Sequence, residues 1–132
     1  ITCLGTLQIF DDIELPLNNL LMLLNHKGRI IIQGSFNDNP VDVITRYRIA
    51  GDQKEKWQSG WNLYCEQSYN KVLNSSKYKL SYNWYNFDMP FGIKKTDDVM
   101  RAWTIKTEKN NFQQVNGLSQ LVTKKFLVID KI

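Results

Sequence analysis

The sequence has few of the residues from which metal and nucleotide sites are usually built. Its only histidine is His26, and its two cysteines, Cys3 and Cys65, are far apart, so the ligand spacing of a zinc site is missing. Its seven glycines never occur as G-x-G, and the P-loop pattern is also missing. With one histidine, no Ser-His-Asp or Cys-His constellation can be assembled. We therefore assign no catalytic residue and predict no metal site.

Long hydrophobic runs are absent as well. No stretch approaches the roughly 18 apolar residues that a membrane span needs, and the first residues lack the basic segment of a signal peptide. Two cysteines without paired spacing favour reduced, buried thiols over a disulfide framework. We expect a cytoplasmic protein that does not enter a membrane.

Strong charge of one sign is also lacking, since the net charge is only +4. The basic residues are scattered, apart from pairs such as Lys94-Lys95 and Lys124-Lys125, and scatter of this kind is typical of a solvated surface. A nucleic-acid-binding module stays open as an alternative, because aromatic side chains could stack on bases. The candidates for such stacking are Trp57, Trp61, Tyr82 and Trp84.

What the chain does contain is a clear strand–helix–strand pattern over residues 1–36. The run ITCLGTLQIF is apolar on both faces, which suits a strand buried between layers. A helix is indicated next by apolar residues at helical spacing, with Asp11 or Asp12 as its cap and Gly28 as the left-handed residue that ends it. The apolar run RIIIQGSF follows, so we predict a βαβ unit with two parallel strands. The apolar helix positions are Ile13, Leu17, Leu20, Leu21 and Leu24.

The rest of the chain changes from helical to antiparallel patterns. We predict a helix over residues 37–49, a polar loop over 50–60 and a short helix over 65–76. Alternation over 78–87 favours an edge or antiparallel strand, with Leu80, Tyr82 and Trp84 on one face. Residues 101–117 indicate a hairpin around Lys109, Asn110 and Asn111, and an apolar strand ends the chain at 124–132.

The carboxyl ends of the two parallel strands are the natural place for a ligand. Small residues there, namely Gly5, Gly34 and Ser35, would let a ligand approach the backbone closely. Cys3, Leu4 and Gly5 would form one wall of such a pocket. Polar groups are supplied nearby by Gln8, Gln33, Ser35 and Asn37. Ordinary strand-to-helix turns would carry the same residues, so both interpretations stay open at this point.

Residues 1–36 resemble the fourth strand, following helix and fifth strand of class I S-adenosylmethionine-dependent methyltransferases. Gln8 stands where the family commonly has histidine. The segments WQSGWNLY and WTIKTE resemble later parts of the same family, and KKFLVIDKI resembles its antiparallel seventh strand. The positions that match in the first segment are Gly5, Leu7, Gln8, Asp12, Leu21, Leu24, Gly28 and Ile30 to Ile32.

This resemblance implies an α/β fold, a partial Rossmann-like methyltransferase sheet in which a parallel βαβ unit is followed by antiparallel strands and an added β-hairpin. Residues 1–132 would be the C-terminal part of the domain: a βαβ unit and helix in 1–50, the acceptor side in 51–77, and antiparallel strands with the hairpin in 78–132. The family's first three strands, with the glycine-rich cofactor loop, are not in this sequence. We therefore expect an N-terminal half, or a partner chain, to cover the edge of the strand in residues 1–10.

The implied function is methyl transfer from S-adenosylmethionine to an unknown small-molecule or macromolecular acceptor, with this chain supplying part of the cofactor pocket. Cofactor contacts would come from Cys3, Leu4, Gly5 and Leu7. The acceptor side would be formed by Gln8, Ser35, Phe36, Asn37, Trp57, Trp61 and Tyr64. The alternative is a non-catalytic module of the same fold that binds nucleic acid or a protein partner.

Overall fold

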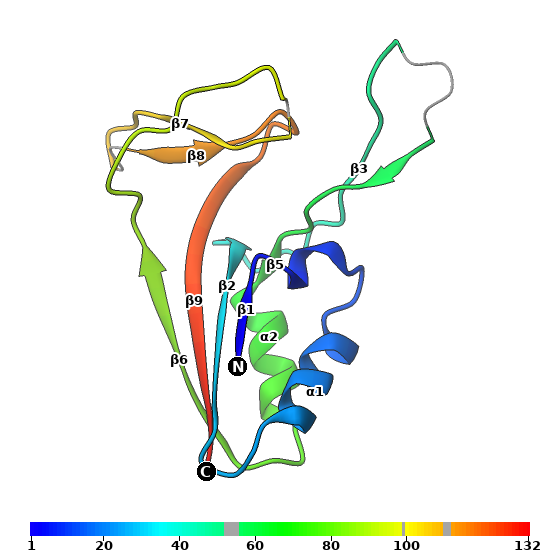
Figure 1. Cartoon of the computed structure of the whole chain (residues 1–132), viewed down its shortest axis with the longest axis vertical. Helices are drawn as coiled ribbons and strands as arrows, with labels where there is room; N and C mark the ends of the chain where they lie inside the picture. Colours follow the sequence, from blue (N-terminus) through cyan, green and yellow to red (C-terminus); the bar gives the residue numbers. More distant parts are fainter. Residues whose placement is uncertain (52–55, 99, 110–111) are drawn as a thin grey trace.

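The computed structural model describes residues 1–51, 56–98, 100–109 and 112–132, and it shows a mixed sheet with two helices (Figure 1). The helices are α1 (Glu14–Leu23) and α2 (Glu66–Asn74), and a short 3-10 turn η1 spans Leu7–Ile9. The strands are β1 (Thr2–Leu4), β2 (Arg29–Asn37), β3 (Arg46–Tyr47), β4 (Gln58–Ser59), β5 (Tyr64–Cys65), β6 (Leu80–Phe87), β7 (Trp103–Ile105), β8 (Gln113–Val115) and β9 (Leu121–Lys131).

The centre of the sheet is a parallel pair joined to a long antiparallel strand. β1 pairs with β2 in parallel, with Cys3 beside Ile32, and β5 continues the same edge of β2 beyond β1. β9 runs antiparallel to β2 on the other side, and β6 runs antiparallel to β9. The predicted βαβ unit with its parallel strands is therefore confirmed, as are the antiparallel later strands and the pairing of β7 with β8. The first strand is shorter than predicted, because Leu7–Ile9 form a 3-10 turn and only Cys3 of β1 is buried. The hairpin turn predicted at Asn110 and Asn111 lies outside the described residues.

One face of this sheet packs on both helices and forms the core. Leu17 and Leu21 of α1 and Ile30 of β2 are completely buried in one cluster, which also contains Leu127 and Ile129 of β9. Alternate residues of β6, namely Leu80, Tyr82 and Trp84, pack on this core as their period-2 pattern predicts.

An aromatic group completes the core at α2. Phe36 meets Tyr69 with ring centroids 5.3 Å apart and Trp84 at 5.0 Å, both edge to face. Trp84 also donates its indole N–H to Asn70 Oδ1 (3.0 Å), so the polar end of this large side chain is satisfied. Tyr82 and Trp84 are therefore used in packing, and they do not form an exposed surface for stacking bases.

Two features around α1 test the predicted start and end of that helix. Asp12 Oδ1 accepts a hydrogen bond from Glu14 N (2.9 Å), so a predicted capping carboxylate satisfies a backbone donor of the first turn. The prediction that Gly28 takes the left-handed conformation is wrong, because Lys27 has that conformation, with φ of 58°. Gly28 is needed for space instead: a Cβ there would lie 2.8 Å from Asn25 O and from Leu24 Cδ1.

The helix predicted over residues 37–49 does not form. Val43 makes an isolated antiparallel bridge with Leu63, and Arg46–Tyr47 pair with Gln58–Ser59 as β3 and β4. The β-branched residues of this segment favour extended backbone. Asp42, just before Val43, accepts hydrogen bonds from Cys65 N (2.8 Å) and Ser68 Oγ (2.5 Å) at the start of α2. The predicted loop over 50–60 falls partly on residues 52–55, outside the described residues.

Two extensions project beyond the end of the sheet at which β1 and β2 finish (Figure 1). One carries β3 and β4, and the other carries β7 and β8, which joins β9 through Val115 and Leu121. Both cysteines are buried free thiols, as predicted from their spacing. None of the described helices has the length and apolar character that crossing a membrane requires.

Candidate functional site

A cavity of about 700 Å³ lies where the carboxyl ends of β1 and β2 meet the segments that lead to and from the two extensions. Gly5, Gln8 and Ser35 line it from the sheet, and Trp61 and Leu63 line it from the segment before β5. The wall is completed by Ile93, Lys94, Thr96, Asp98, Met100, Arg101, Ala102, Asn116, Gln120, Val122 and Lys124. Its volume lies within the ~300–1,000 Å³ of typical small-molecule sites.

The sheet side of the cavity depends on two glycines. Gly5 has φ of 68°, a conformation that favours glycine, and it turns the chain sharply after β1. Gly34 lies on β2 beneath the buried Gln8 side chain, and a Cβ at residue 34 would lie 2.6 Å from the end of the Gln8 amide. Gln8 satisfies both ends of its amide when Nε2 donates to Gly5 O (3.0 Å) and Oε1 accepts from Ser35 N. The Gln8 amide thus ties the turn after β1 to β2.

A partly buried lysine, Lys124, lies on the same side of the cavity. Lys124 is directly opposite Ser35 in the β2–β9 ladder, and its Nζ donates to Ser35 Oγ (2.7 Å). Burial lowers the pKa of the Lys124 ammonium group. No ion pair of Lys124 is found among the described residues. The next residue, Lys125, points to the other face and pairs with Glu66 at 2.6 Å and Asp38 at 3.1 Å.

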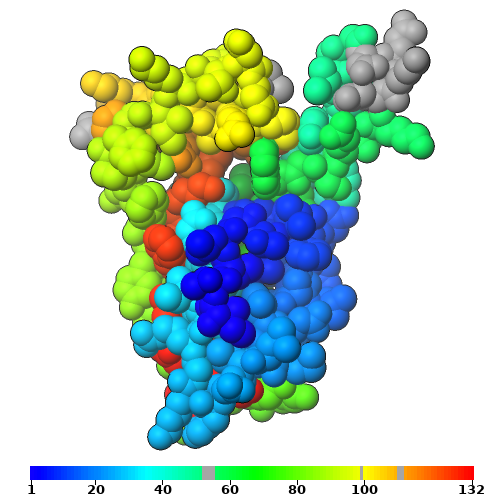
Figure 2. Space-filling model, viewed as in Figure 1, coloured from blue at the N-terminus to red at the C-terminus, as the bar shows by residue number. Residues whose placement is uncertain are grey.

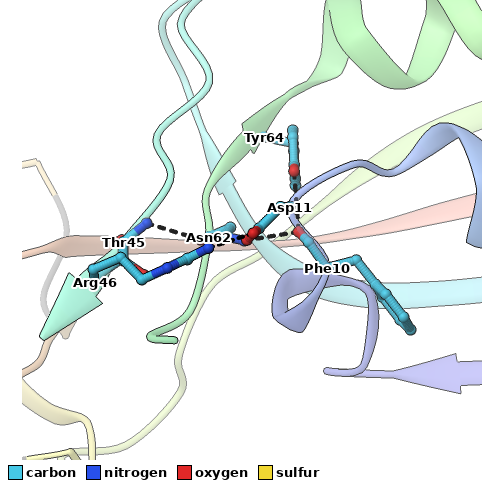
Figure 3. A network of polar contacts seen from close by, with 6 residues as sticks. All are labelled: Phe10, Asp11, Thr45, Arg46, Asn62 and Tyr64. Atoms are coloured by element: carbon cyan, nitrogen blue, oxygen red, sulfur yellow. Dashed lines mark hydrogen bonds and ion pairs between the residues drawn. The ribbon is translucent and has the colours of Figure 1, made fainter. Parts of the chain in front are cut away.

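Asn62 fixes the part of the wall between β4 and β5 (Figure 3). This fully buried side chain donates to Phe10 O (2.7 Å) and Asp11 Oδ1 (3.3 Å), and it accepts from Thr45 N (2.8 Å). Its backbone N also donates to Gln8 O (2.8 Å). Because Asn62 stands between Trp61 and Leu63, these bonds hold two cavity residues in position.

Charged and phenolic groups support the same network. Arg46 Nη2 forms an ion pair with Asp11, and the hydrogen bond from Arg46 lowers the pKa of the Asp11 carboxyl group. Tyr64 donates its hydroxyl to Phe10 O (3.0 Å). Burial and the nearby Asp11 carboxylate raise the pKa of Tyr64 to about 12, so it stays a protonated donor at neutral pH.

The opposite wall is tied to this network through Gln120. Its Nε2 donates to Thr45 Oγ1 (2.8 Å) and to Trp61 O (3.3 Å), and its Oε1 accepts from Asn116 Nδ2 (3.0 Å). Near the other end of the wall, Ile93 N donates to Thr104 Oγ1 (2.8 Å) of β7. Both extensions are therefore connected to the cavity by hydrogen bonds.

The cavity combines an apolar wall with an excess of positive charge. Its apolar lining includes Trp61, Leu63, Ile93, Met100, Ala102 and Val122. Its charged lining residues are Lys94, Arg101 and Lys124 against one carboxylate, Asp98, which lies 3.5 Å from Arg101. Such a site suits an organic molecule that carries negative charge.

The structure brings four of the residues predicted from the sequence to this cavity, namely Gly5, Gln8, Ser35 and Trp61. Cys3, Leu7, Phe36 and Tyr64 are buried, while Leu4 is 61% exposed. Asn37 is bound locally to Val41 O and Asn39 N. Trp57 is 65% exposed beside β4, and the Arg48 guanidinium carbon lies 5.4 Å from the centroid of the Trp57 ring. These seven are not among the cavity-lining residues.

Sequence reasoning missed the residues that enclose the cavity from the later half of the chain. Lys124 could have been found from the sequence, because alternation along 121–131 places it on the opposite face from Lys125 and the core residue Leu127. The lining residues within 93–98 and 100–102, and the polar pair Asn116 and Gln120, show no comparable pattern in the sequence. Their place at the cavity depends on contacts between distant parts of the chain.

The fold and cavity define a mixed α/β protein with a ligand-sized site at the carboxyl ends of its parallel strands. Comparisons with protein-family models, curated proteins and solved structures find no significant match.

Proposed function

We propose that this chain takes part in methyl transfer from S-adenosylmethionine to an acceptor held in the cavity. The observation that supports this most is the cavity itself: it lies at the carboxyl ends of β1 and β2 and is lined by Gly5, Gln8, Ser35 and Trp61. The parallel β1–β2 pair and the antiparallel last strand β9 also agree with the resemblance seen in the sequence.

Gly5 is the residue on this chain that suits a bound cofactor best. Its left-handed turn has no side chain, and the backbone there faces the cavity between β1 and η1. A planar or extended ligand can therefore approach the main chain closely. When bound, S-adenosylmethionine supplies an electrophilic methyl group; residues outside this chain would hold the remainder of the cofactor.

The acceptor side would be formed by Gln8, Ser35 and Trp61. The Gln8 amide is held by Gly5 and Ser35, so the polar floor is fixed before a ligand arrives. Trp61 gives an apolar surface against which the body of an acceptor can pack. Rate enhancement would come mainly from holding the acceptor in line with the methyl group, and the catalytic base, if the acceptor needs one, is unassigned.

The outer edge of β1 is the proposed contact with the N-terminal half or a partner chain. β1 pairs only with β2 among the described residues, and Ile1 and Leu4 are 46% and 61% exposed. The N-terminal residues lie at the surface of the face shown in Figure 2. An unpaired strand edge with exposed apolar residues is suited to pairing with a further strand. We place the assembled protein in the cytoplasm.

Calorimetric binding of S-adenosylhomocysteine by the native polypeptide that contains this chain would test the proposal. We expect saturable binding to the wild type, and about 10-fold weaker binding for Gly5→Ala, because the added Cβ strains the turn. Gly51→Ala is the matched control: Gly51 also has positive φ (94°) but no atom lies within 4 Å of its added Cβ. Absence of binding by the wild type would refute the methyltransferase proposal.

A further inference from the structure

The cavity contains an unbalanced positive charge at a fixed position. Lys124 Nζ is held by Ser35 Oγ at 2.7 Å, and Ser35 is buried at 7% exposure. Asp98, the one carboxylate among the cavity-lining residues, is paired with Arg101. Lys125, one residue along β9, has two carboxylate partners. The chain therefore neutralises one of two adjacent lysines and leaves the other facing the cavity.

Lys124 lines the cavity together with apolar side chains, as a charged residue of a ligand-binding site often does. Val122 lines the cavity from the same strand, and Trp61 and Leu63 line it from the segment before β5. A lysine facing a partly apolar cavity without a counter-ion is costly, and an anion bound beside it would reduce that cost. The Ser35 hydroxyl donates its own proton elsewhere when it accepts from Lys124, so a second hydrogen bond to the anion is available.

We propose that the cavity binds a small organic carboxylate, whose carboxylate group pairs with Lys124 and whose apolar body packs against Trp61 and Leu63. The proposal rests on the proposed function only in identifying this carboxylate as the methyl acceptor. Lys94 and Arg101 at the same cavity add a favourable field for an anion. The acceptor class is thus a monoanionic molecule of modest size rather than a neutral one.

Benzoate and benzamide form a matched pair of probes, because they have nearly the same shape and differ in charge. Binding to the native polypeptide that contains this chain would be measured by ligand-detected NMR and calorimetry. We expect benzoate to bind the wild type at least 10-fold more tightly than benzamide, and Lys124→Met to weaken benzoate about 10- to 100-fold while leaving benzamide unchanged. Lys79→Met, the same change at an exposed position, should bind both probes like the wild type.

A second measurement does not depend on any variant. The titration of the Lys124 side chain, followed by NMR of its ammonium nitrogen in the wild type, should shift to higher pH when benzoate is added, because a paired anion favours the charged form. Equal affinity for the two probes, benzoate affinity in Lys124→Met within threefold of the wild type, or an unchanged Lys124 titration would overturn the proposal.

Two further comparisons distinguish this proposal from the methyltransferase proposal. Benzoate binding would be repeated with saturating S-adenosylhomocysteine; displacement of benzoate would mean that Lys124 holds the carboxylate of the cofactor, and the acceptor assignment would fail. Discrimination between benzoate and benzamide without any binding of S-adenosylhomocysteine would support the carboxylate site and refute methyl transfer. Binding of S-adenosylhomocysteine without that discrimination would refute the carboxylate site alone.

Discussion

Lys124 and Lys125 are neighbours on β9, yet they point to opposite faces of the sheet and have opposite surroundings. Lys125 lies on the face covered by the helices, where Glu66 of α2 and Asp38 after β2 balance its charge. Lys124 lies on the cavity face, where it donates a hydrogen bond to the neutral Ser35 hydroxyl. One face of the sheet is thus completed by contacts within the chain, whereas the other retains polar groups that a ligand can use.

The same difference extends along β2. Phe36 points to the helix face and is in contact with Tyr69 and Trp84, whereas Ser35 points to the cavity. A strand alternates its side chains between faces, so adjacent positions can serve stability and binding separately. Paired substitutions at neighbouring positions can therefore test whether the two faces have these separate roles.

The largest effect should come from Phe36→Ala. Removing a buried aromatic ring from a packed cluster typically costs about 3–5 kcal/mol of unfolding free energy. Ser35→Ala, one position away, should cost about 1 kcal/mol or less, because it removes a single hydroxyl. Urea unfolding of the two variants measures both values. Similar losses for both would mean that the two faces do not differ in their contribution to stability.

The cavity wall depends on polar bonds, and Asn62→Ala should reveal this. The variant loses the bonds to Phe10 O and from Thr45 N and leaves these partly buried backbone groups without their partner, so we expect a loss of about 2–3 kcal/mol. Asn37→Ala is the control, because the Asn37 side chain makes local bonds only and should cost about 1 kcal/mol or less. Chemical denaturation measures both values. If Asn62→Ala lowers the unfolding free energy no more than Asn37→Ala does, Asn62 does not hold the cavity wall in place.

The sequence predicts the face of the sheet that the helices cover better than it predicts the cavity face. Helical spacing identifies Leu17 and Leu21, and period-2 alternation identifies Leu80, Tyr82 and Trp84, because these patterns follow from local geometry and burial. The predicted helix over 37–49 fails because Val43 and Arg46 pair with residues that follow much later. Most of the cavity wall is missed for the same reason: Gln120 meets Thr45 across 75 positions of sequence.

Lys125→Met should destabilise the protein by a smaller amount, about 1–3 kcal/mol, because Glu66 and Asp38 lose a charged partner. Burial alone would lower the pKa of Lys125, but its hydrogen bonds to Glu66 and Asp38 outweigh this and raise the pKa above 10.5. A raised pKa means that the contribution is fully present below pH 10.5 and disappears as pH rises through the folded-state value. The difference between wild type and variant should therefore be constant near neutrality and shrink in strong alkali, as thermal unfolding across pH would show.

Lys124→Met should have the smallest effect and the opposite sign. Burial lowers the pKa of Lys124 below its ordinary value of 10.5, so the folded protein binds this proton less readily than the unfolded chain does. The resulting cost is fully present below the folded-state pKa and disappears as pH rises from that value to 10.5. At neutral pH the variant should be more stable than the wild type by up to about 1 kcal/mol, and this advantage should shrink toward pH 10.5. Thermal unfolding without ligand measures it; a variant less stable than the wild type at neutral pH would mean that Lys124 serves the fold, as Lys125 does, rather than a ligand.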